Sequence, residues 1–261
     1  MLDITEELHA ELLRHAYKHR PEEMCGAIVR NEDGTLQFIK IANVHAQPKD
    51  YFSMDMAQLA AIEDDTSKVI VAYAHSHPDD TSTPSAFDRA QCNLHGKPYV
   101  IVGTKDDSLT VIEPHTVPLL GRQYVHAMQD CYSLVQDYYL RELGITLPDF
   151  ERAPLWWTDK NSESLYEKGF TEAGFVAVPK TTIQALNRHD VLIAYWGATL
   201  FPNHAMVYLG DNGKLRSEQS PDVVGERLYL HHLYDSVSCR TLLGESKFQD
   251  IAFVLRHKSL L

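Results

Sequence analysis

The chain lacks the features of a nucleic-acid-binding protein or a membrane protein. Its 261 residues include 24 Lys and Arg against 36 Asp and Glu, which gives a formal net charge of −12. Nucleic acid is not expected as a partner, because there is no surplus of positive charge to neutralise phosphates. No apolar run approaches the roughly 20 residues that span a bilayer, so membrane insertion is not expected either.

Cysteine is also scarce, and no pair of cysteines has the C-x-x-C spacing. A disulfide framework is therefore not expected, and a reducing compartment suits the chain. Residues 1–7 are acidic and lack the basic and apolar regions of a secretory signal peptide. We expect the protein to be made and folded in the cytoplasm, and to leave the cell only by lysis or as part of a particle. The four cysteines are Cys25, Cys92, Cys131 and Cys239.

Two histidines follow a short apolar segment in the first half of the chain. Residues 68–74 are rich in β-branched side chains, which predicts a buried strand. In an extended chain, side chains two positions apart point to the same face. His75 and His77 are therefore predicted to converge on one point, and Pro78 is predicted to end the strand.

A serine and an aspartate follow this pair at helical spacing. Ser85 is a natural N-cap for a helix over residues 86–95, and Asp88 lies three residues further on, on the same helix face. Two imidazoles and one carboxylate are a three-ligand set for zinc that leaves one position open. That arrangement is typical of catalytic rather than structural zinc sites.

Residues 75–88 resemble the JAMM (MPN) metallopeptidase signature without a gap, and residues 21–26 match its upstream Pro-x-Glu-x-Cys-Gly context. By this resemblance, Glu23 acts as general base toward a zinc-bound water, and Ser85 helps to hold the tetrahedral oxyanion. Zinc brings bound water to a pKa of about 7, so a carboxylate can take its proton at neutral pH. The alternatives are a correctly spaced but inactive relative, or a polar loop with two unpaired histidines. The resemblance implies one zinc ion held by His75, His77 and Asp88.

The remaining pattern of the first half predicts helices around one sheet, in three layers. Two prolines and a glycine interrupt all periodicity over residues 113–121, which favours a boundary there. We therefore expect a domain over residues 1–113, a linker over 114–121 and a second domain over 122–261. The other expected elements are a first helix capped by Asp3, strands over 26–30 and 36–44, a helix over 55–62, and strands over 99–102 and 109–112.

The second half contains a cysteine at a predicted helix start. Residues 130–139 predict a helix, with Cys131 in its first turn. Because the N-terminus of a helix favours the thiolate, we expect the pKa of the Cys131 thiol to be lowered, which would make it a nucleophile.

A nucleophilic thiol needs a histidine base close in space. His204 begins an apolar strand over residues 204–210 and is the predicted base. A third polar group should orient that imidazole, and the sequence offers His231 or His232 for this role.

Residues 130–135 and 203–210 resemble two motifs of the NlpC-type cysteine peptidases, which have a papain-like α+β fold and cleave peptides of bacterial cell walls. The resemblance implies Cys131 as nucleophile, His204 as base and His231 as the third residue. Residues 217–228 look like an insertion before that third position. This leaves His232, Glu218 or Gln219 as alternatives, as well as a purely structural role for both histidines.

Read together, the two halves resemble the tail assembly protein K family of long-tailed bacteriophages over nearly the whole chain. The resemblance implies an α+β protein: an α/β JAMM/MPN domain with a cytidine-deaminase-like three-layer fold, then the papain-like domain. It implies a tail-tip component, present in the host cytoplasm during assembly, that contacts other tail-tip proteins and hydrolyses peptidoglycan peptides during assembly or DNA entry. The segments that add to it are residues 156–157, 161–166, 174–175 and 253–257.

Two other interpretations stay open. Both domains could act as docking bodies, with sites that are closed or inactive in the assembled particle, or the JAMM half could process a protein instead of wall peptide. The sequence also leaves open whether Trp156 and Trp157 stack on glycan, although their large apolar area favours the core.

Overall fold

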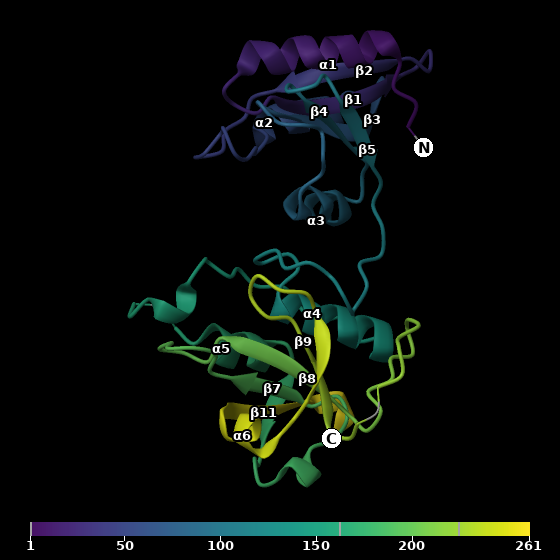
Figure 1. Ribbon diagram of the computed structural model, residues 1–261. Helices are drawn as coiled ribbons and strands as arrows, with labels where there is room; N and C mark the ends of the chain where they lie inside the picture. The colour runs from purple at the N-terminus through teal and green to yellow at the C-terminus, as the bar shows by residue number, and fades with distance from the viewer. Residues whose placement is uncertain (1, 162, 224) are drawn as a thin grey trace. The chain divides into compact units, whose positions relative to one another are not determined.

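A computed structural model describes residues 2–161, 163–223 and 225–261 of the chain. Ser162, within the segment 161–166, and Val224, within the segment 217–228, lie outside the described residues. The chain divides into two compact units, residues 1–116 and 117–261 (Figure 1), and each is described by itself. None of the helices in the described ranges has the length and apolar character that crossing a membrane requires.

The first unit is built on a five-stranded mixed sheet in the order β2-β1-β3-β4-β5. β1 lies antiparallel between β2 and β3, β3 and β4 are parallel, and β5 is antiparallel at the edge. The strands are β1 (Cys25–Asn31), β2 (Leu36–Ile41), β3 (Lys68–His77), β4 (Tyr99–Gly103) and β5 (Leu109–Ile112).

β2 and β3 each differ from the predicted range by three residues at their C-terminal end, whereas the other strand ends agree within one residue. β3 continues to His77, so both histidines belong to the strand itself. β2 ends at Ile41 rather than at residue 44, because Asn43 leaves the β1 pairing and forms an isolated bridge with Met54.

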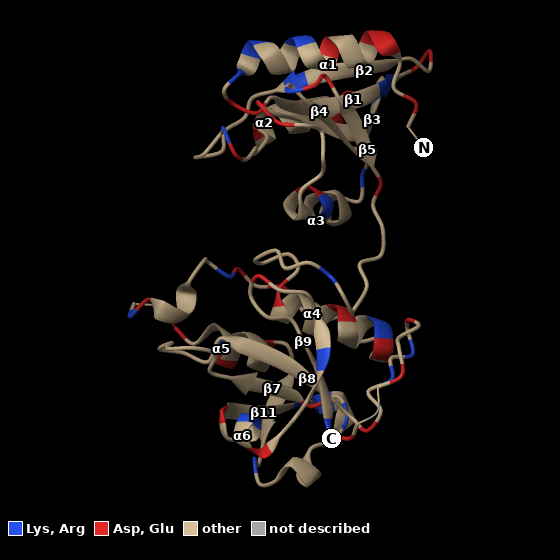
Figure 2. Ribbon diagram, in the orientation of Figure 1, with Lys and Arg blue, Asp and Glu red and all other residues tan. Residues whose placement is uncertain are grey.

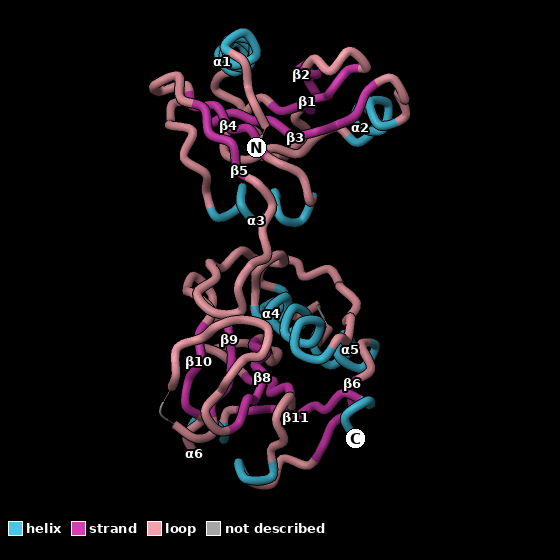
Figure 3. The backbone as a smooth tube through the Cα atoms, turned by 90° about the vertical axis from the view of Figure 1, so that its right-hand side faces the viewer, coloured by secondary structure: helices cyan, strands magenta, loops and turns pink. Residues whose placement is uncertain are grey.

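Three helices cover the two faces of this sheet. α1 (Glu6–His19) packs Leu8, Leu12 and Ala16 on one face, whereas α2 (Met56–Glu63) and α3 (Ala86–His95) cover the other (Figure 3). The predicted three-layer arrangement is therefore present. Figure 2 shows acidic residues at the start of α1 and basic residues at its end, the order that the helix dipole favours.

The predicted cap of α1 was wrong by two residues. The Thr5 hydroxyl, not Asp3, accepts the hydrogen bond from Leu8 N, at 3.2 Å. An N-cap residue directly precedes the first helical residue and accepts from an N–H two or three positions later. Because the helix begins at Glu6, Thr5 and not Asp3 occupies that position.

The second unit contains a six-stranded antiparallel sheet in the order β10-β9-β8-β7-β11-β6. Its strands are β6 (Phe175–Val178), β7 (Val191–Ala194), β8 (His204–Gly210), β9 (Leu228–His231), β10 (Cys239–Leu242) and β11 (Ile251–His257).

Helices cover both faces of this sheet as well. α4 (Cys131–Tyr138) and α5 (Leu165–Glu172) lie on one face, and the short α6 (Glu245–Gln249) lies on the other (Figure 3). α4 continues into a π-helical turn (Tyr139–Leu143), and short 3₁₀ turns are formed by Trp156–Thr158, Ile183–Ala185 and Lys258–Leu260.

The packing of α4 on β8 positions the second site. Leu134 and Val135 of α4 share one core cluster with Ala205 and Val207 of β8. This contact holds the first residue of the helix close to the first residue of the strand, so Cys131 and His204 are brought to the same region.

Candidate active sites

In the first unit, the end of β3 and the start of α3 bring three potential metal ligands together. Asp88 Oδ1 lies 3.0 Å from His75 Nε2, and Asp88 Oδ2 lies 3.3 Å from His77 Nε2. The two Nε2 atoms are 3.3 Å apart. One ligand atom from each residue lies within 4.8 Å of the other two, which fits a single cation.

A hydrogen bond orients His77, and burial affects His75, in ways that suit metal binding. His77 Nδ1 donates to the carbonyl of Thr81 at 3.0 Å, which leaves the Nε2 lone pair facing the cluster. His75 is buried against the ring of Phe52, at 4.6 Å between ring centroids. Burial lowers the pKa of His75, which keeps it in the neutral form that a metal requires.

Ser85 and Asp88 form the predicted helix cap. The Ser85 hydroxyl accepts from Asp88 N at 3.1 Å, and Asp88 Oδ2 accepts from Ser85 N and Oγ at 2.7 Å each. Burial alone would raise the pKa of Asp88, but the adjacent imidazoles of His75 and His77 and the Ser85 hydroxyl hold it well below its usual range. The carboxylate is therefore fixed and ionised, as a ligand must be. In this arrangement the Ser85 hydroxyl donates its hydrogen bond to Asp88 and not into the pocket.

Glu23 lies just before β1 and lines the same pocket as His77, Ser85 and Asp88, a hollow of about 410 Å³. Its side chain is only 7% exposed. Burial raises the pKa of Glu23 to about 8, with His77 opposing that shift and Asp88 adding to it. A carboxyl group with such a pKa can both accept and release a proton near neutral pH.

Asn43 supports the chain at Glu23 and was not predicted from the sequence. Asn43 Nδ2 donates to the carbonyls of Glu23 and Tyr51, both at 3.1 Å. Its Oδ1 accepts from His45 N at 3.1 Å and from Ser53 N at 3.0 Å. One side chain thus ties the 45–53 loop, which forms a wall of the pocket, to the chain at Glu23.

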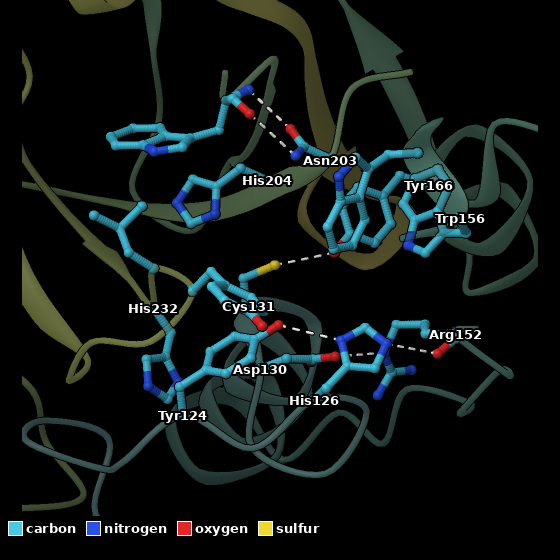
Figure 4. Close-up of a pocket in the computed structure, with 14 residues that line it drawn as sticks. Tyr124, His126, Asp130, Cys131, Arg152, Trp156, Tyr166, Asn203, His204 and His232 are labelled. Carbon is cyan, nitrogen blue, oxygen red and sulfur yellow. Dashed lines mark hydrogen bonds and ion pairs between the residues drawn. The ribbon is translucent and has the colours of Figure 1, made fainter. Parts of the chain in front are cut away.

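In the second unit, Cys131 is the first residue of α4. Asp130 caps the helix, accepting from Ser133 N at 2.9 Å. The Cys131 side chain is 6% exposed, and its Sγ lies 3.0 Å from Tyr166 Oη (Figure 4). Tyr166 was not predicted, because α5 lies far from Cys131 in sequence and no spacing rule connects them.

The prediction that the thiol pKa is lowered was wrong. Burial raises the pKa of Cys131 to about 11, and Asp130 adds to the increase. Hydrogen bonds from Tyr166 and from the Ala205 backbone act in the opposite direction but are smaller. Burial of the sulfur therefore decides the direction of the shift, and the thiol is protonated in this conformation.

The structure joins His204 to one of the candidate third residues. His204 Nε2 lies 3.2 Å from His231 Nδ1, on the neighbouring strand β9. His232 instead places Nε2 3.3 Å from the carbonyl of Ser236. Glu218 accepts from Leu119 N at 2.7 Å, and Gln219 is exposed. Of the four candidates, only His231 has a hydrogen bond with His204 among the described residues.

Cys131 and His204 line one small cavity of about 50 Å³ (Figure 4). Trp156 is buried in the core, as expected from its area, and Trp157 is half-buried; both line the cavity. Burial lowers the pKa of His204 well below its usual value, and His231 and Lys247 add to the decrease. The pair is thus present as neutral thiol and neutral imidazole.

Comparisons with known proteins agree with this division into two kinds of site. Residues 5–113 match the family described as prokaryotic homologs of the JAB domain, and residues 96–254 match the NlpC/P60 family. The order of the two domains and the α+β fold class predicted from the sequence are thereby confirmed.

Similar proteins were found along most of the chain. The tail tip assembly protein K of Escherichia phage N15 is 29% identical over 250 residues, covering 95% of this chain and 93% of that protein. The protein of the same name from Escherichia phage lambda is 35% identical over 173 residues, covering 66% of this chain and 73% of that protein. A solved JAB1/MPN domain protein from Archaeoglobus fulgidus is 19% identical and covers 41% of this chain and 83% of that chain, with a TM-score of 0.30.

Proposed function

Since the chain belongs to the tail tip assembly protein K family and carries an NlpC/P60 domain, we propose that it is a peptidoglycan hydrolase of a phage tail tip with two peptidase centres. The observation that supports this most strongly is the His204–His231 hydrogen bond at the cavity that also contains Cys131. Its partners would be other tail-tip proteins and the bacterial wall, and it would be present in the host cytoplasm during assembly.

The second unit would cleave a wall peptide through a thioester. Cys131 Sγ exchanges its contact with Tyr166 for His204 Nδ1, which takes the thiol proton as the sulfur attacks the peptide carbonyl. His204 then gives that proton to the departing amine, and a water molecule hydrolyses the thioester. His231 holds the ring of His204 in place throughout.

The first unit would hydrolyse an amide without a covalent intermediate. His75, His77 and Asp88 would hold zinc, in keeping with their nitrogen and oxygen donors and their spacing. When bound, zinc supplies Lewis acidity toward water and the scissile carbonyl. Glu23 would take a proton from water and deliver it to the leaving amine. Ser85 would donate to the developing oxyanion after exchanging its hydrogen bond to Asp88 for one to that oxygen.

The test is digestion of isolated peptidoglycan by the purified protein, followed by mass analysis of the released peptides. Cys131→Ala should abolish one set of peptides and leave the fold intact, since nucleophile and base act as a unit. Glu23→Gln should preserve that set and remove any product of the metal centre. Unchanged wall digestion by Cys131→Ala would refute the cysteine assignment.

A second candidate function is supported by the protonated, buried thiol. In this case both units serve as docking bodies in the tail tip, and their sites stay closed in the particle. Wall digestion by the free protein, but not by assembled tails, would indicate closure on assembly. If Cys131→Ala yields normal infectious particles and neither form digests peptidoglycan, the docking role is favoured.

The metal centre has a further alternative substrate, a tail protein instead of wall peptide. Glu23→Gln separates the two cases. An uncleaved tail component in particles made with this variant, with wall peptides unchanged, would favour protein processing.

A further inference from the structure

His231 has hydrogen-bond partners at both ring nitrogens. Its Nδ1 faces His204 Nε2 at 3.2 Å, and its Nε2 lies 3.0 Å from Thr241 Oγ1 and 3.3 Å from Cys239 Sγ. β10 pairs with β9 so that Cys239 is opposite His231 and Thr241 is opposite Tyr229. Because side chains alternate along a strand, Thr241 and Cys239 lie on the sheet face that carries His231.

The positions of the protons in this chain of groups follow from the proposed chemistry. His204 can accept the Cys131 proton only if its Nδ1 carries a lone pair, so its single proton must be on Nε2. That Nε2–H donates to His231 Nδ1, which must then be the acceptor. His231 in turn must carry its own proton on Nε2, where it needs an acceptor.

Two atoms lie near enough to accept a hydrogen bond from His231 Nε2, and they differ in distance and in acceptor strength. The Thr241 hydroxyl oxygen is the closer and the stronger acceptor, since a thiol sulfur accepts hydrogen bonds only weakly. We propose that Thr241 is a positioning residue of the cysteine centre, holding His231 in the Nε2–H tautomer and thereby leaving His204 Nδ1 free for the Cys131 proton. This inference rests on the proposed cysteine-peptidase function and adds a fourth member behind its three residues.

The surroundings of His231 keep it neutral, which makes its tautomer the relevant variable. Burial lowers the pKa of His231 to about 4, and the positive charge of Lys247 and the neighbouring His232 add to the decrease. The rings of Trp196 and Tyr229 also pack against it, at 6.2 Å and 4.8 Å between centroids. With one proton and two nitrogens, the ring takes the tautomer that its partners select.

The test compares two substitutions at one position in the full-length protein. Thr241→Val keeps the shape and removes the hydroxyl, and Thr241→Ser keeps the hydroxyl and removes the methyl. The readout is the rate of Cys131 alkylation by iodoacetamide from pH 5 to 9, with peptide mapping to separate it from Cys25, Cys92 and Cys239. Alkylation requires the thiolate, which forms when His204 Nδ1 takes the Cys131 proton, and it needs no wall substrate.

We expect Thr241→Val to slow Cys131 alkylation at pH 7 by about three- to tenfold, the effect of one net hydrogen bond. Thr241→Ser and Cys239→Ala should each be alkylated at Cys131 at a rate within about twofold of the parent. Nitrogen-15 chemical shifts of His231 should show the Nε2–H tautomer in the parent and a growing Nδ1–H population in Thr241→Val.

The other outcomes separate failure of the Thr241 role from failure of the cysteine centre. If Cys131 reacts readily in the parent and equally fast in a folded Thr241→Val, the role of Thr241 is refuted and the cysteine centre stands. If Cys239→Ala slows alkylation more than Thr241→Val does, the thiol is the acceptor and the inference fails. If Cys131 of the parent reacts no faster than the buried Cys25 and Cys92, the cysteine-peptidase proposal falls and this inference falls with it.

Discussion

Replacing Arg152 by Met should strongly destabilise the second unit, because it leaves the Asp130 carboxylate buried without its cation. The two side chains are 1% and 3% exposed, and Arg152 Nε donates to Asp130 Oδ2 at 2.7 Å. The guanidinium also donates to the carbonyls of Ala127 and Phe150, at 2.6 Å and 2.8 Å, and to Asp149 Oδ1 at 2.8 Å. Breaking a buried pair by removing one partner typically costs about 3–5 kcal/mol.

The pH dependence of this loss has a definite sign. Burial would raise the pKa of Asp130, but in the parent Arg152 and the Ser133 backbone hold it below its usual value. This contribution to the parent's stability is present above the unfolded pKa of Asp, about 3.9, and is lost only as the pH falls through the lower folded value. In Arg152→Met the Coulomb attraction of the guanidinium is gone and only the hydrogen bonds from Ser133 and Ala127 oppose burial, so the pKa of Asp130 should rise above the unfolded value. The difference in unfolding free energy between the parent and Arg152→Met should therefore increase with pH. The increase is about 1.4 kcal/mol per pH unit over the range in which Asp130 is protonated in the folded variant and ionised in the unfolded chain.

Urea unfolding followed by tryptophan fluorescence measures this effect in the full chain. All three tryptophans, Trp156, Trp157 and Trp196, lie in the second unit, so the signal reports that unit alone. Lys214→Met is the matched control, because its pair with Asp222 is exposed at both ends and such pairs contribute at most about 1 kcal/mol.

A double variant separates lost charge from lost packing. Arg152→Met with Asp130→Asn removes the buried charge while keeping a side chain that can cap α4, and it should recover part of the stability at pH 7. A loss below about 1 kcal/mol in Arg152→Met, or the same loss at pH 4.5 and pH 7, would show that the reasoning about the buried carboxylate is wrong.

Three further predictions concern the first unit. Because burial raises the pKa of Glu23 to about 8, the neutral carboxyl stabilises the fold below the unfolded pKa of Glu, and that contribution is lost as pH rises through about 8. Glu23→Gln should therefore stabilise the metal-free protein more at pH 8 than at pH 5, and an equal change at both pH values in thermal unfolding would contradict this. Ser85→Ala should destabilise α3 by about 1 kcal/mol, because it removes the side-chain cap, and amide exchange of α3 measures this effect. The same substitution should weaken zinc binding about 10- to 100-fold, because Asp88 loses a hydrogen bond that supports it, and zinc titration measures this second effect. Elemental analysis should find about one zinc per chain, removable by a chelator and absent from Asp88→Asn; normal zinc content in that variant would place the metal elsewhere.

The candidate metal-ligand cluster could be predicted from the sequence because its geometry is local. His75 and His77 are two residues apart on one strand, and Ser85 and Asp88 share the first turn of α3. Strand and helix periodicity alone place each pair on one face. Glu23 required the family resemblance, since no local period connects it to residues 75–88.

The cysteine centre was less accessible, because its partners come from separate elements. The sequence could not choose between His231 and His232, and only the β8–β9 pairing brings the first of them to His204. Tyr166 could not be predicted for the same reason. The thiol pKa was predicted with the wrong sign because the helix start is visible in sequence, whereas the depth of Cys131 beneath the surface is a property of the folded unit.

The Asp88 carboxylate has two roles, one in the cap of α3 and one in the candidate metal site. It accepts from the Ser85 backbone at the start of α3, and it completes the ligand triangle with His75 and His77. Under the proposed zinc assignment, ion binding and the stability of the first turn of that helix are therefore coupled through one side chain. Removal of zinc should be detected at the backbone as faster amide exchange at residues 85–88 than in the zinc-loaded protein, while exchange in the sheet stays unchanged.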